Sequence, residues 1–413
     1  MDFNDKYLSL LEANIKKQKT NQKYNLKEIT SEVNKSIYNI NLTDKKVAIT
    51  VGSRGITNIS SIIKILVNFF KEKGAIPFIV PAMGSHGGNS KEGKIEVLAS
   101  LGVTEKSINA PINANIETIQ IGNTATGKPV HCLESALAAD FVIIVNRIKN
   151  HTDFHGEIGS GLIKMAAVGL GGEAGAKTVH SEGYSNLCKY VKEIGLKKLS
   201  LLPVLFGVAI IEDFYGNLFH LEIVKPGQFL QKEKTLYKKA REFQPTLPVS
   251  KLDLLVVINF GKEISGSGMD PNVTGRYPSG ETVSPDAKRI VVLRLTPQSH
   301  GNASGIGLAD IITTKFYNAI DLNVFYKNQL ACNGFLSGKI PIIMPSDYRA
   351  IECAINSLNQ KSNIKLMIID NTSSLEKIRI SSSLKEEVRE NGYTISDKSV
   401  KYTFDGEGNI KNL

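Results

Sequence analysis

Histidine and glycine are concentrated in one part of this sequence. Five of the seven histidines (His86, His131, His151, His155 and His180) fall between residues 86 and 180, and seven of the residues from 156 to 175 are glycine. Because imidazole titrates near neutral pH, clustered histidines point to proton transfer or metal binding. Crowded glycines indicate tight turns and a close approach of the backbone to a bound molecule. We therefore expect the functional site in the N-terminal half of the chain.

The first candidate element is a glycine-rich turn, PAMGSHGGNSKEGK (81–94), between an expected strand and an expected helix. Exposed N–H groups at the start of a helix attract anions such as phosphate or carboxylate. His86 lies on this turn, at the carboxyl end of a strand, where ligands bind in open α/β sheets. The alternative is a histidine in a tight turn without chemistry. The motif lacks the G-K-[ST] ending of a Walker A loop, so no nucleotide hydrolase is predicted.

The second candidate element is NRIKNHTDFHGEIGSGLIKMAAVGLGGEAGAKTVH (146–180). His151 and Asp153 follow the expected strand, and Lys164 lies among apolar neighbours. A lysine in an apolar setting loses hydration, which favours its neutral, nucleophilic form. In the alternative interpretation Lys164 extends its amine to solvent or pairs with Glu157, and the glycines only shape a loop. His180, 16 residues after the lysine, is a metal ligand or a helix-capping residue.

The surrounding pattern alternates short apolar strands with amphipathic helices, which predicts two α/β domains with largely parallel sheets and an active-site cleft between them. Strands are expected at 45–51, 75–83, 141–148, 204–213, 253–260, 289–295 and 365–370, and helices at 58–74, 89–102, 229–242, 305–320 and 347–358. We expect a catalytic domain over 1–225, an interdomain connection over 226–250, rich in Lys, Gln and Pro, and a second α/β domain over 251–413.

Two loops of the second domain, FGKEISGSGMDPNVTGRY (260–277) and LTPQSHGNASGIGLAD (295–310), each follow an expected strand. They are dense in glycine and polar residues and could complete the cleft, or they are ordinary turns with capping Asp and Asn. Their candidate site residues are Lys262, Asp270, Asn272, Arg276 and His300.

Composition narrows the class of protein. The net charge of +10 comes from lysines dispersed over polar faces, without a recognised nucleic-acid motif, so no nucleic-acid partner is expected. The four cysteines form no C-x-x-C pair, which fits a reducing compartment. We find no secretory signal and no apolar run of spanning length, and we expect a cytoplasmic protein without a membrane partner. The sequence leaves open whether the chain forms a homo-oligomer.

The order of these motifs resembles the lactate racemase family, which consists of nickel-pincer-dependent 2-hydroxyacid racemases and epimerases. The resemblance rests on Gly-x-His after a strand, a histidine-containing loop, a Gly-Ser-Gly loop with Lys164, and His180 beyond it; it covers roughly residues 20–215. It implies racemisation of a 2-hydroxyacid by hydride abstraction and return through a cofactor tethered to a lysine. Enzymes that synthesise the cofactor are then implied as partners.

The resemblance also implies residue roles. Lys164 would carry the nickel-pincer nucleotide covalently, and His180 would ligate nickel. His86 and His151 would be general bases on opposite faces of the substrate. Arg54 would lie near substrate and cofactor, and the turn residues Ser85, Gly87 and Gly88 would contact the cofactor phosphate.

The sequence departs from the family pattern at several of these positions. His155 competes with His151 for the second base, and His151 is favoured because it lies nearer the strand end. Gly52-Ser53-Arg54 replaces the family's Asp-x-Thr-Arg, and Gly87-Gly88 replaces an Arg-Pro. These changes touch substrate contacts, so we expect a lactate-like 2-hydroxyacid or a sugar acid. Two other classes remain open: a metal-dependent hydrolase or lyase that uses His86, His151, Asp153 and His180 as ligands, and a non-catalytic protein that binds anionic metabolites.

Overall fold

The computed structural model describes residues 7–15, 25–181 and 183–411, which fall into two compact units. One unit is Thr20–Gln244, and the other joins Met1–Lys19 to Pro245–Leu413. Each unit has its own sheet, and both sheets are largely parallel over the strands that form their centre. The expected α/β class is therefore confirmed.

The sheet of the first unit has the order β3-β2-β6-β7-β8, parallel from β3 to β7 and antiparallel at β8. Its strands are β2 (Lys46–Val51), β3 (Ile76–Pro81), β6 (Phe141–Arg147), β7 (Val204–Glu212) and β8 (Leu218–Val224). A separate hairpin pairs β4 (Thr118–Asn123) with β5 (Pro129–Leu133). Helices and short turns connect them: α2 (Glu28–Ser36), α3 (Ile59–Glu72), η1 (Gly87–Asn89), α4 (Lys91–Ser100), α5 (Glu105–Ile108), α6 (Glu134–Leu137), α7 (Leu162–Lys164), η2 (Met165–Gly169), α8 (Gly172–His180), η3 (Tyr184–Asn186), α9 (Leu187–Leu201), η4 (Pro226–Gln228) and α10 (Phe229–Arg241).

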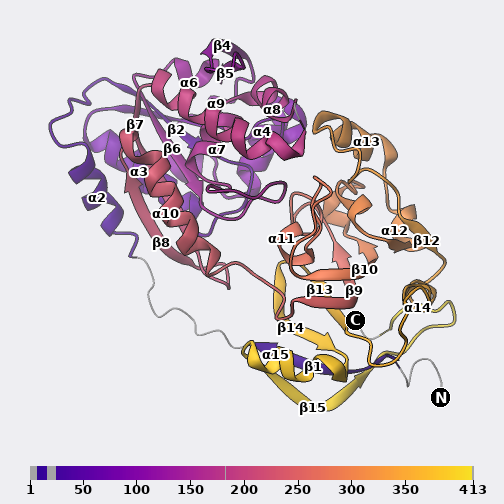
Figure 1. The fold of residues 1–413 in the computed structure, drawn as a ribbon. Coiled ribbons are helices and arrows are strands. Elements are labelled where there is room, and N and C mark those ends of the chain that lie inside the picture. Colours follow the sequence, from indigo (N-terminus) through magenta and orange to yellow (C-terminus); the bar gives the residue numbers. More distant parts are fainter. Residues whose placement is uncertain (1–6, 16–24, 182, 412–413) are drawn as a thin grey trace. The chain divides into compact units, whose positions relative to one another are not determined.

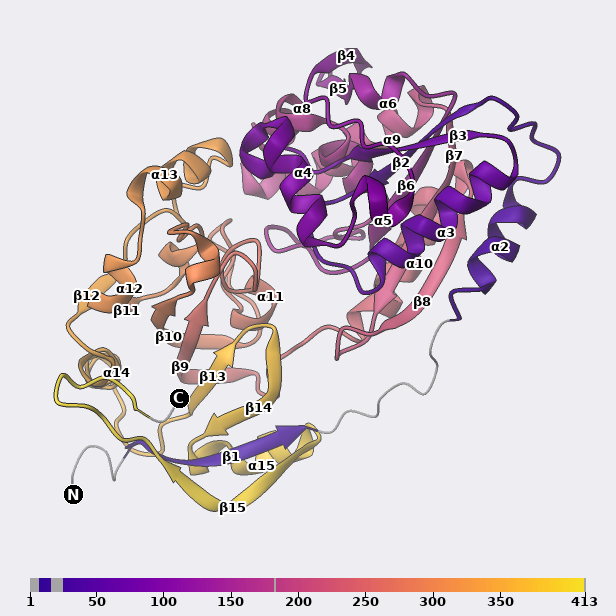
Figure 2. The same cartoon turned by 180° about the vertical axis from the view of Figure 1, so that it is seen from behind.

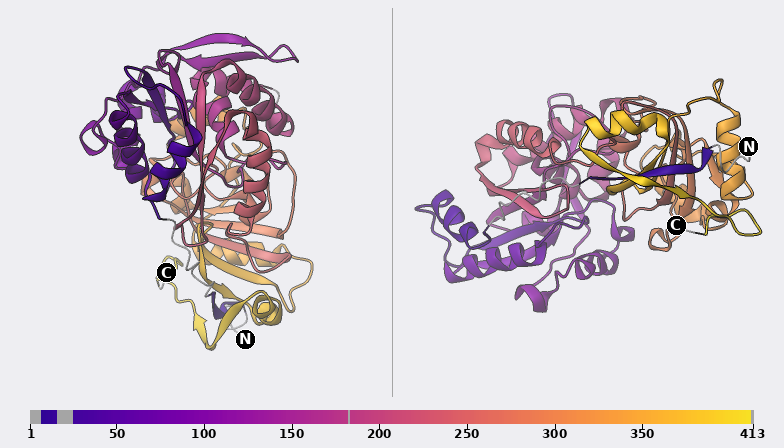
Figure 3. Two further views of the ribbon diagram at one scale, coloured as in Figure 1. Left: turned by 90° about the vertical axis from the view of Figure 1, so that its left-hand side faces the viewer. Right: turned by 90° about the horizontal axis from the view of Figure 1, so that it is seen from below.

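Both faces of this sheet are covered by helices, as near-continuous apolar strands require. Along β6, Val142 and Ile144 pack into one core cluster and Ile143 and Val145 into another, because successive side chains point to opposite faces. Helices α2 and α3 lie on the second cluster, and α7, η2, α9 and α10 lie on the first. Figures 1 and 2 show the helices of this unit from opposite sides, and Figure 3 shows them after a rotation of 90°.

The second unit is built on an eight-stranded sheet of order β12-β11-β10-β9-β13-β14-β1-β15, parallel from β12 to β13 and antiparallel beyond. Its strands are β1 (Ser9–Ile15), β9 (Lys251–Phe260), β10 (Asp286–Leu295), β11 (Ile311–Thr313), β12 (Ile342–Met344), β13 (Leu366–Asn371), β14 (Ser374–Ile380) and β15 (Tyr393–Lys401). Its helical segments are α11 (Pro271–Thr274), η5 (Pro297–Ser299), η6 (Ile306–Leu308), α12 (Thr314–Asn318), α13 (Leu322–Ala331), α14 (Asp347–Asn356), η7 (Ser382–Leu384) and α15 (Lys385–Glu390).

The unit boundaries differ from those expected from the sequence. Strand β1 pairs with β14 and β15, so the N-terminal strand belongs to the second unit and not to a domain over 1–225. The stretch expected as an interdomain connection, 226–250, contains α10, whose Phe229, Leu236 and Ala240 are buried in the core of the first unit. The helix itself was expected at 229–242; its packing follows from an apolar face that composition alone did not reveal.

The second difference concerns residues 305–320, where a single helix was expected and is not found. The structure has η6, strand β11 and then α12 in that stretch. Ile311 and Ile312 pair in parallel with Val291 and Val292 of β10, and both are buried. A short apolar run that is buried on both faces is compatible with either a strand or a helix, because hydrophobic periodicity does not distinguish the two.

No helix within the described residues is both long enough and apolar enough to cross a membrane.

Candidate active site

The sequence-predicted residues of the first unit follow the carboxyl ends of three parallel strands. Arg54 comes after β2, His86 after β3 and His151 after β6. Parallel strands end at the same edge of their sheet, and ligands of open α/β sheets bind at that edge. Lys164 and His180 belong to the helical segments that follow the β6 loop, so the candidate residues of the first unit gather at this edge.

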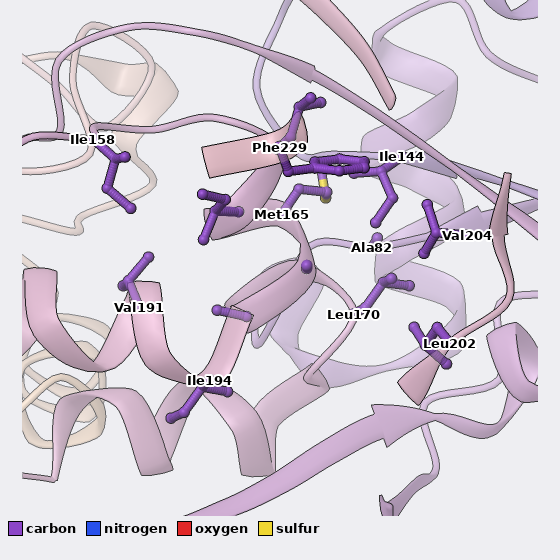
Figure 4. Packing of buried hydrophobic residues seen from close by; sticks show 14 of the residues in the cluster. Ala82, Ile144, Ile158, Met165, Leu170, Val191, Ile194, Leu202, Val204 and Phe229 are labelled. Carbon is purple, nitrogen blue, oxygen red and sulfur yellow. The ribbon is translucent and has the colours of Figure 1, made fainter. Parts of the chain in front are cut away.

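Lys164 ends the short helix α7 and is followed at once by the π-helical turn η2. The N–H of Leu170 bonds to the carbonyl of Met165, five residues back, at 2.9 Å. Such wide turns are rare and occur frequently at functional sites. Met165 belongs to the buried cluster drawn in Figure 4, together with Phe229 and Ile144, and this packing anchors the turn beneath the lysine.

The Lys164 amine has an environment that favours its neutral form. Burial and the positive charge of Arg54 lower its pKa, the carboxylate of Asp153 acts in the opposite direction, and the net result is a pKa of about 8. A lysine whose pKa is this close to neutrality holds a useful fraction of nucleophilic amine. The alternative pairing with Glu157 is wrong, because Glu157 binds Lys192 and, at 2.5 Å, Lys234.

His180, the last residue of α8, shares its charged neighbours with Lys164. Burial lowers the pKa of His180, Asp153 raises it and Lys164 lowers it. The imidazole is therefore neutral at pH 7, the form in which a histidine nitrogen ligates a metal. The charge of Lys164 thus acts on His180, and Asp153 acts on both, although 16 residues separate the lysine and the histidine in the sequence.

His151 is the most deeply buried histidine of the site, with 9% of its surface exposed. Burial lowers its pKa well below the ordinary value, and the charges of Lys164 and His180 add to the effect. Its ring stacks on Phe154 at 4.2 Å between centroids. The backbone N–H of Asp153 donates to Nδ1 of His151 at 3.1 Å, which fixes the orientation of the ring.

Arg54 and Arg147 bring positive charge to the same edge. Arg54 is exposed to solvent, yet enough protein surrounds the guanidinium for lost hydration to lower its pKa, with a further lowering from Arg147. Arg147 is paired with Glu212 at the end of β7. Glu212 also accepts the N–H of Thr57 at 2.6 Å, so it connects the end of β6 to the loop that carries Arg54.

The turn after β3 has the conformation that its glycines predict. Gly84, Gly87 and Gly88 have positive φ, and a side chain at Gly87 would come within 2.7 Å of the backbone of Gly93. His86 and Ser85 are exposed on this turn, and Nδ1 of His86 hydrogen-bonds to Oγ of Ser53, next to Arg54. The N–H of Gly84 donates to the carbonyl of Gly169 at 3.3 Å. The turn therefore contacts the end of the Lys164 segment.

His155 is placed differently from His151. It is exposed, whereas His151 is buried. The charges of Lys164 and His180 act on His151, which places this histidine in the electrostatic environment of the lysine.

The candidate residues of the second unit hold their own loops together. Asp270 caps α11 by accepting the N–H of Asn272 at 2.9 Å, and Asn272 accepts the hydroxyl of Tyr277 at 2.7 Å. Arg276 donates to three carbonyls (those of Leu308, Ala287 and Lys288) and pairs with Asp310 at 2.9 Å. Lys262 donates to the carbonyl of Gly266, and His300 is an exposed residue with positive φ. These contacts match the capping interpretation of the two loops.

Sequence reasoning missed Arg147, Glu212, Lys198 and Glu233 as parts of this region. The first two stand at strand ends, which is a usable signal for a ligand-facing position. Lys198 and Glu233 lie on α9 and α10, and charged residues on a helix are ordinarily assigned to the solvent face. Nothing in the local pattern marks either residue as fully buried.

Metal-ligating side chains are not clustered in the part of the site that the structure describes. Among the described residues, no group of three or more His, Cys, Asp or Glu side chains is arranged to hold a metal. The hydrolase or lyase interpretation, with direct ligation by four of these side chains, therefore gains no support from the geometry.

The fold and the site together define a class of protein: an α/β chain with a half-buried lysine and neutral histidines at the carboxyl edge of a parallel sheet. Residues 2–185 match the family model of the lactate racemase N-terminal domain. This match covers somewhat less than half of the chain, and this N-terminal part is assigned to the lactate racemase family.

One solved structure has a similar fold. The lactate racemase apoprotein of Thermoanaerobacterium thermosaccharolyticum aligns over 91% of this chain and 96% of its own, with a TM-score of 0.51 and 14% identity. A structural-genomics protein of Thermotoga maritima aligns over 77% and 82%, with a TM-score of 0.48 and 12% identity. No curated protein matches the sequence.

Proposed function

We propose that this protein is a racemase or epimerase of a 2-hydroxyacid, lactate-like or a sugar acid, that works with a nickel-pincer nucleotide bound covalently to Lys164. The single observation that carries the proposal is the charged environment that Lys164 and His180 share: the amine has its pKa lowered to about 8, and its charge, together with burial, lowers the pKa of His180. These are the two groups that such a cofactor needs from the protein, one for the covalent link and one as a metal ligand.

The residues present fit this cofactor better than a bare metal ion. The described residues offer no cluster of three protein ligands, so a metal here needs donors brought by an organic group. A neutral imidazole together with soft sulfur donors suits nickel in a tetragonal site. When bound, the cofactor supplies the site that accepts hydride from Cα of the substrate and returns it.

The other residues of the site bind and orient the substrate. Arg54 would hold the carboxylate, since a guanidinium binds a carboxylate bidentately. His86, whose Nδ1 bonds to Ser53, would take the hydroxyl proton at Nε2. His151 would face the substrate oxygen from the other side with its own Nε2. Its burial and shared charges favour it over the exposed His155 for this role.

The test is intact and peptide mass spectrometry of the protein co-expressed with enzymes that synthesise the cofactor, with nickel measured alongside. We expect an adduct on Lys164, about one nickel per chain, and racemisation of at least one member of a 2-hydroxyacid panel on a chiral column. Lys164→Arg should lose adduct, nickel and turnover. Lys177→Ala is the matched control, because Lys177 is an exposed lysine of α8 paired with Glu173. Racemase activity with unmodified Lys164 would falsify the assignment.

A further inference from the structure

Two fully buried ionisable side chains contact the backbone on either side of Lys164 and have no part in the proposed chemistry. Glu233 comes from α10 and Lys198 from α9, and neither has any exposed surface. No ion pair joins them to each other or to another described residue within salt-bridge distance. Both reach the segment from Leu162 to Gly169, which is α7 and the π-helical turn.

Glu233 binds the beginning of the segment. Its Oε2 accepts the N–H of Ile163 at 2.9 Å, and the N–H of Leu162 also bonds to this carboxyl group. The first N–H groups of a helix have no partner within the helix, so a carboxyl group placed there acts as a cap supplied by a distant helix. A side chain at Gly161 would come within 2.4 Å of Oε1 of Glu233. Glycine at 161 is thus required for the carboxyl group to reach the backbone.

Lys198 binds the other end. Its Nζ donates to the carbonyl of Ala167 at 3.2 Å, within the turn η2 that follows Lys164. Carbonyls near the end of a helix lack regular partners, and the wide π turn displaces them further from the usual pattern. The contact therefore fixes the last part of the segment, while Glu233 fixes the first.

Burial of these two groups is unfavourable for stability taken alone. Burial raises the pKa of Glu233 to about 8 and lowers the pKa of Lys198 to about 8, which shows how poorly the interior accommodates either charge. Oε1 of Glu233 has no hydrogen-bond partner among the described residues. Apolar side chains of similar volume commonly serve as well or better in a core. The polar ends of Glu233 and Lys198 are therefore explained by the backbone groups that they bind.

We propose that Glu233 and Lys198 are positioning residues that hold the two ends of the Leu162–Gly169 segment and so fix the direction of the Lys164 side chain. The inference builds on the proposed function of Lys164 as the covalent attachment point. It assigns to each residue a contact with the backbone and none with the substrate or cofactor.

The test uses the full-length protein without cofactor. The rate at which acetic anhydride modifies Lys164 is measured against pH by peptide mass spectrometry, and amide hydrogen exchange is followed over residues 162–169. Glu233→Leu and Lys198→Met each keep the approximate volume and remove the polar contact. We expect exchange in this segment to rise at least tenfold. The apparent pKa of Lys164 should also move from about 8 toward that of an ordinary lysine, because a loosened segment lets the amine reach water.

Conservative variants and core controls separate positioning from simple stability. Glu233→Gln retains an acceptor and Lys198→Gln retains a donor, so both should restore the wild-type values. Leu236→Ala on α10 and Ile194→Ala on α9 remove buried apolar groups from the same helices. If these controls, at an equal loss of thermal stability, change Lys164 labelling as much, the proposal is wrong.

Unchanged labelling and exchange in Glu233→Leu and Lys198→Met would also overturn the proposal. Should Glu233→Leu fail to fold, Lys198→Met decides alone, since it removes a buried charge without a cavity. The labelling needs no cofactor. An absent adduct on Lys164 in loaded protein would therefore refute the proposed function and leave this result standing.

Discussion

The backbone N–H of Asp153 donates to Nδ1 of His151, and this bond decides which nitrogen of the ring carries the proton. When Nδ1 accepts, the neutral ring holds its hydrogen on Nε2, so His151 meets a substrate oxygen as a hydrogen-bond donor. To accept a proton at Nε2, the ring must move its hydrogen to Nδ1 and lose the bond from Asp153. Nδ1 of His86 bonds instead to the Ser53 hydroxyl, which can accept as well as donate, so His86 can leave Nε2 free to take the first proton.

The tautomer of His151 is directly measurable. In histidine-selective ¹⁵N spectra, with the signal assigned by His151→Asn, we expect the Nε2–H pattern. Because burial and nearby positive charges lower the pKa of His151 well below its ordinary value, the signal should not titrate between pH 6 and 8. The exposed His155 serves as the internal comparison. A His151 signal that titrates with a midpoint near 6.5 would contradict the burial and the tautomer together.

The two charges around Lys164 predict opposite effects on its reactivity. Arg54 lowers the pKa of Lys164 and Asp153 raises it. Arg54→Met should therefore raise the apparent pKa of Lys164 above about 8, and Asp153→Asn should lower it below about 8. Competitive acetylation between pH 6 and 11 measures both shifts in the cofactor-free protein. Equal shifts of the same sign in both variants would mean that the segment has moved and that charge is not the cause.

Much of the first unit could be predicted from sequence because its strands are nearly pure apolar runs. FVIIVNR and VLFGVAIIE are buried on both faces and were expected as strands. The second unit was harder. Strand β1 pairs with β14, about 365 residues away in the sequence, and with β15, about 385 residues away. Leu11 pairs with Ile380 of β14, and Leu10 pairs with Val400 of β15. No local pattern reveals such pairing, so the domain expected over 1–225 wrongly included this strand. Its end lies at Gln244 and not at 225 because α10 packs into the core of the first unit.

The site divides in the same way. Residues at strand ends, such as Arg54, His86 and His151, could be proposed from position and type alone. Glu233 and Lys198 could not, because a charged residue within a Lys-rich helix looks like part of a solvated face until tertiary packing buries it. Lys262, Asp270 and Arg276 were candidates by composition, and contacts within their own unit account for them.

Glu233 predicts an unusual pH dependence of stability. Its pKa is raised to about 8 in the folded chain and is near 4.5 in the unfolded chain, so the folded state keeps a proton that the unfolded state releases. The retained proton stabilises the folded state. This stabilisation is complete at low pH and is lost as the pH rises through about 8. Between pH 5.5 and 8, Glu233→Gln should gain about 3 kcal/mol relative to the wild type.

Urea unfolding at several pH values checks this, with Glu242→Gln, an exposed glutamate after the same helix, as the control. A difference between Glu233→Gln and the wild type that stays constant with pH would show that Glu233 is ionised in the folded protein.

The buried pair of Arg294 and Asp347 predicts a large stability effect in the second unit. Arg294 donates to both carboxylate oxygens of Asp347, at 2.5 Å each, and the N–H of Ile410 donates to the same carboxylate at 2.9 Å. Asp347 has no exposed surface, so Asp347→Asn leaves the guanidinium without its counter-charge. We expect a loss of about 3–5 kcal/mol in the free energy of unfolding, measured with urea.

A double-mutant cycle tests whether the pair causes that loss. Arg294→Met combined with Asp347→Asn should cost less than the sum of the single changes, because no unpaired charge then remains. Glu352→Gln, which breaks the exposed pair with Arg349 on the same helix, should leave the urea midpoint unchanged. Acetylation of Lys164 in folded Asp347→Asn should match the wild type, since the lysine belongs to the other unit. Additive costs in the cycle would mean that each residue acts through its own packing and not through the ion pair.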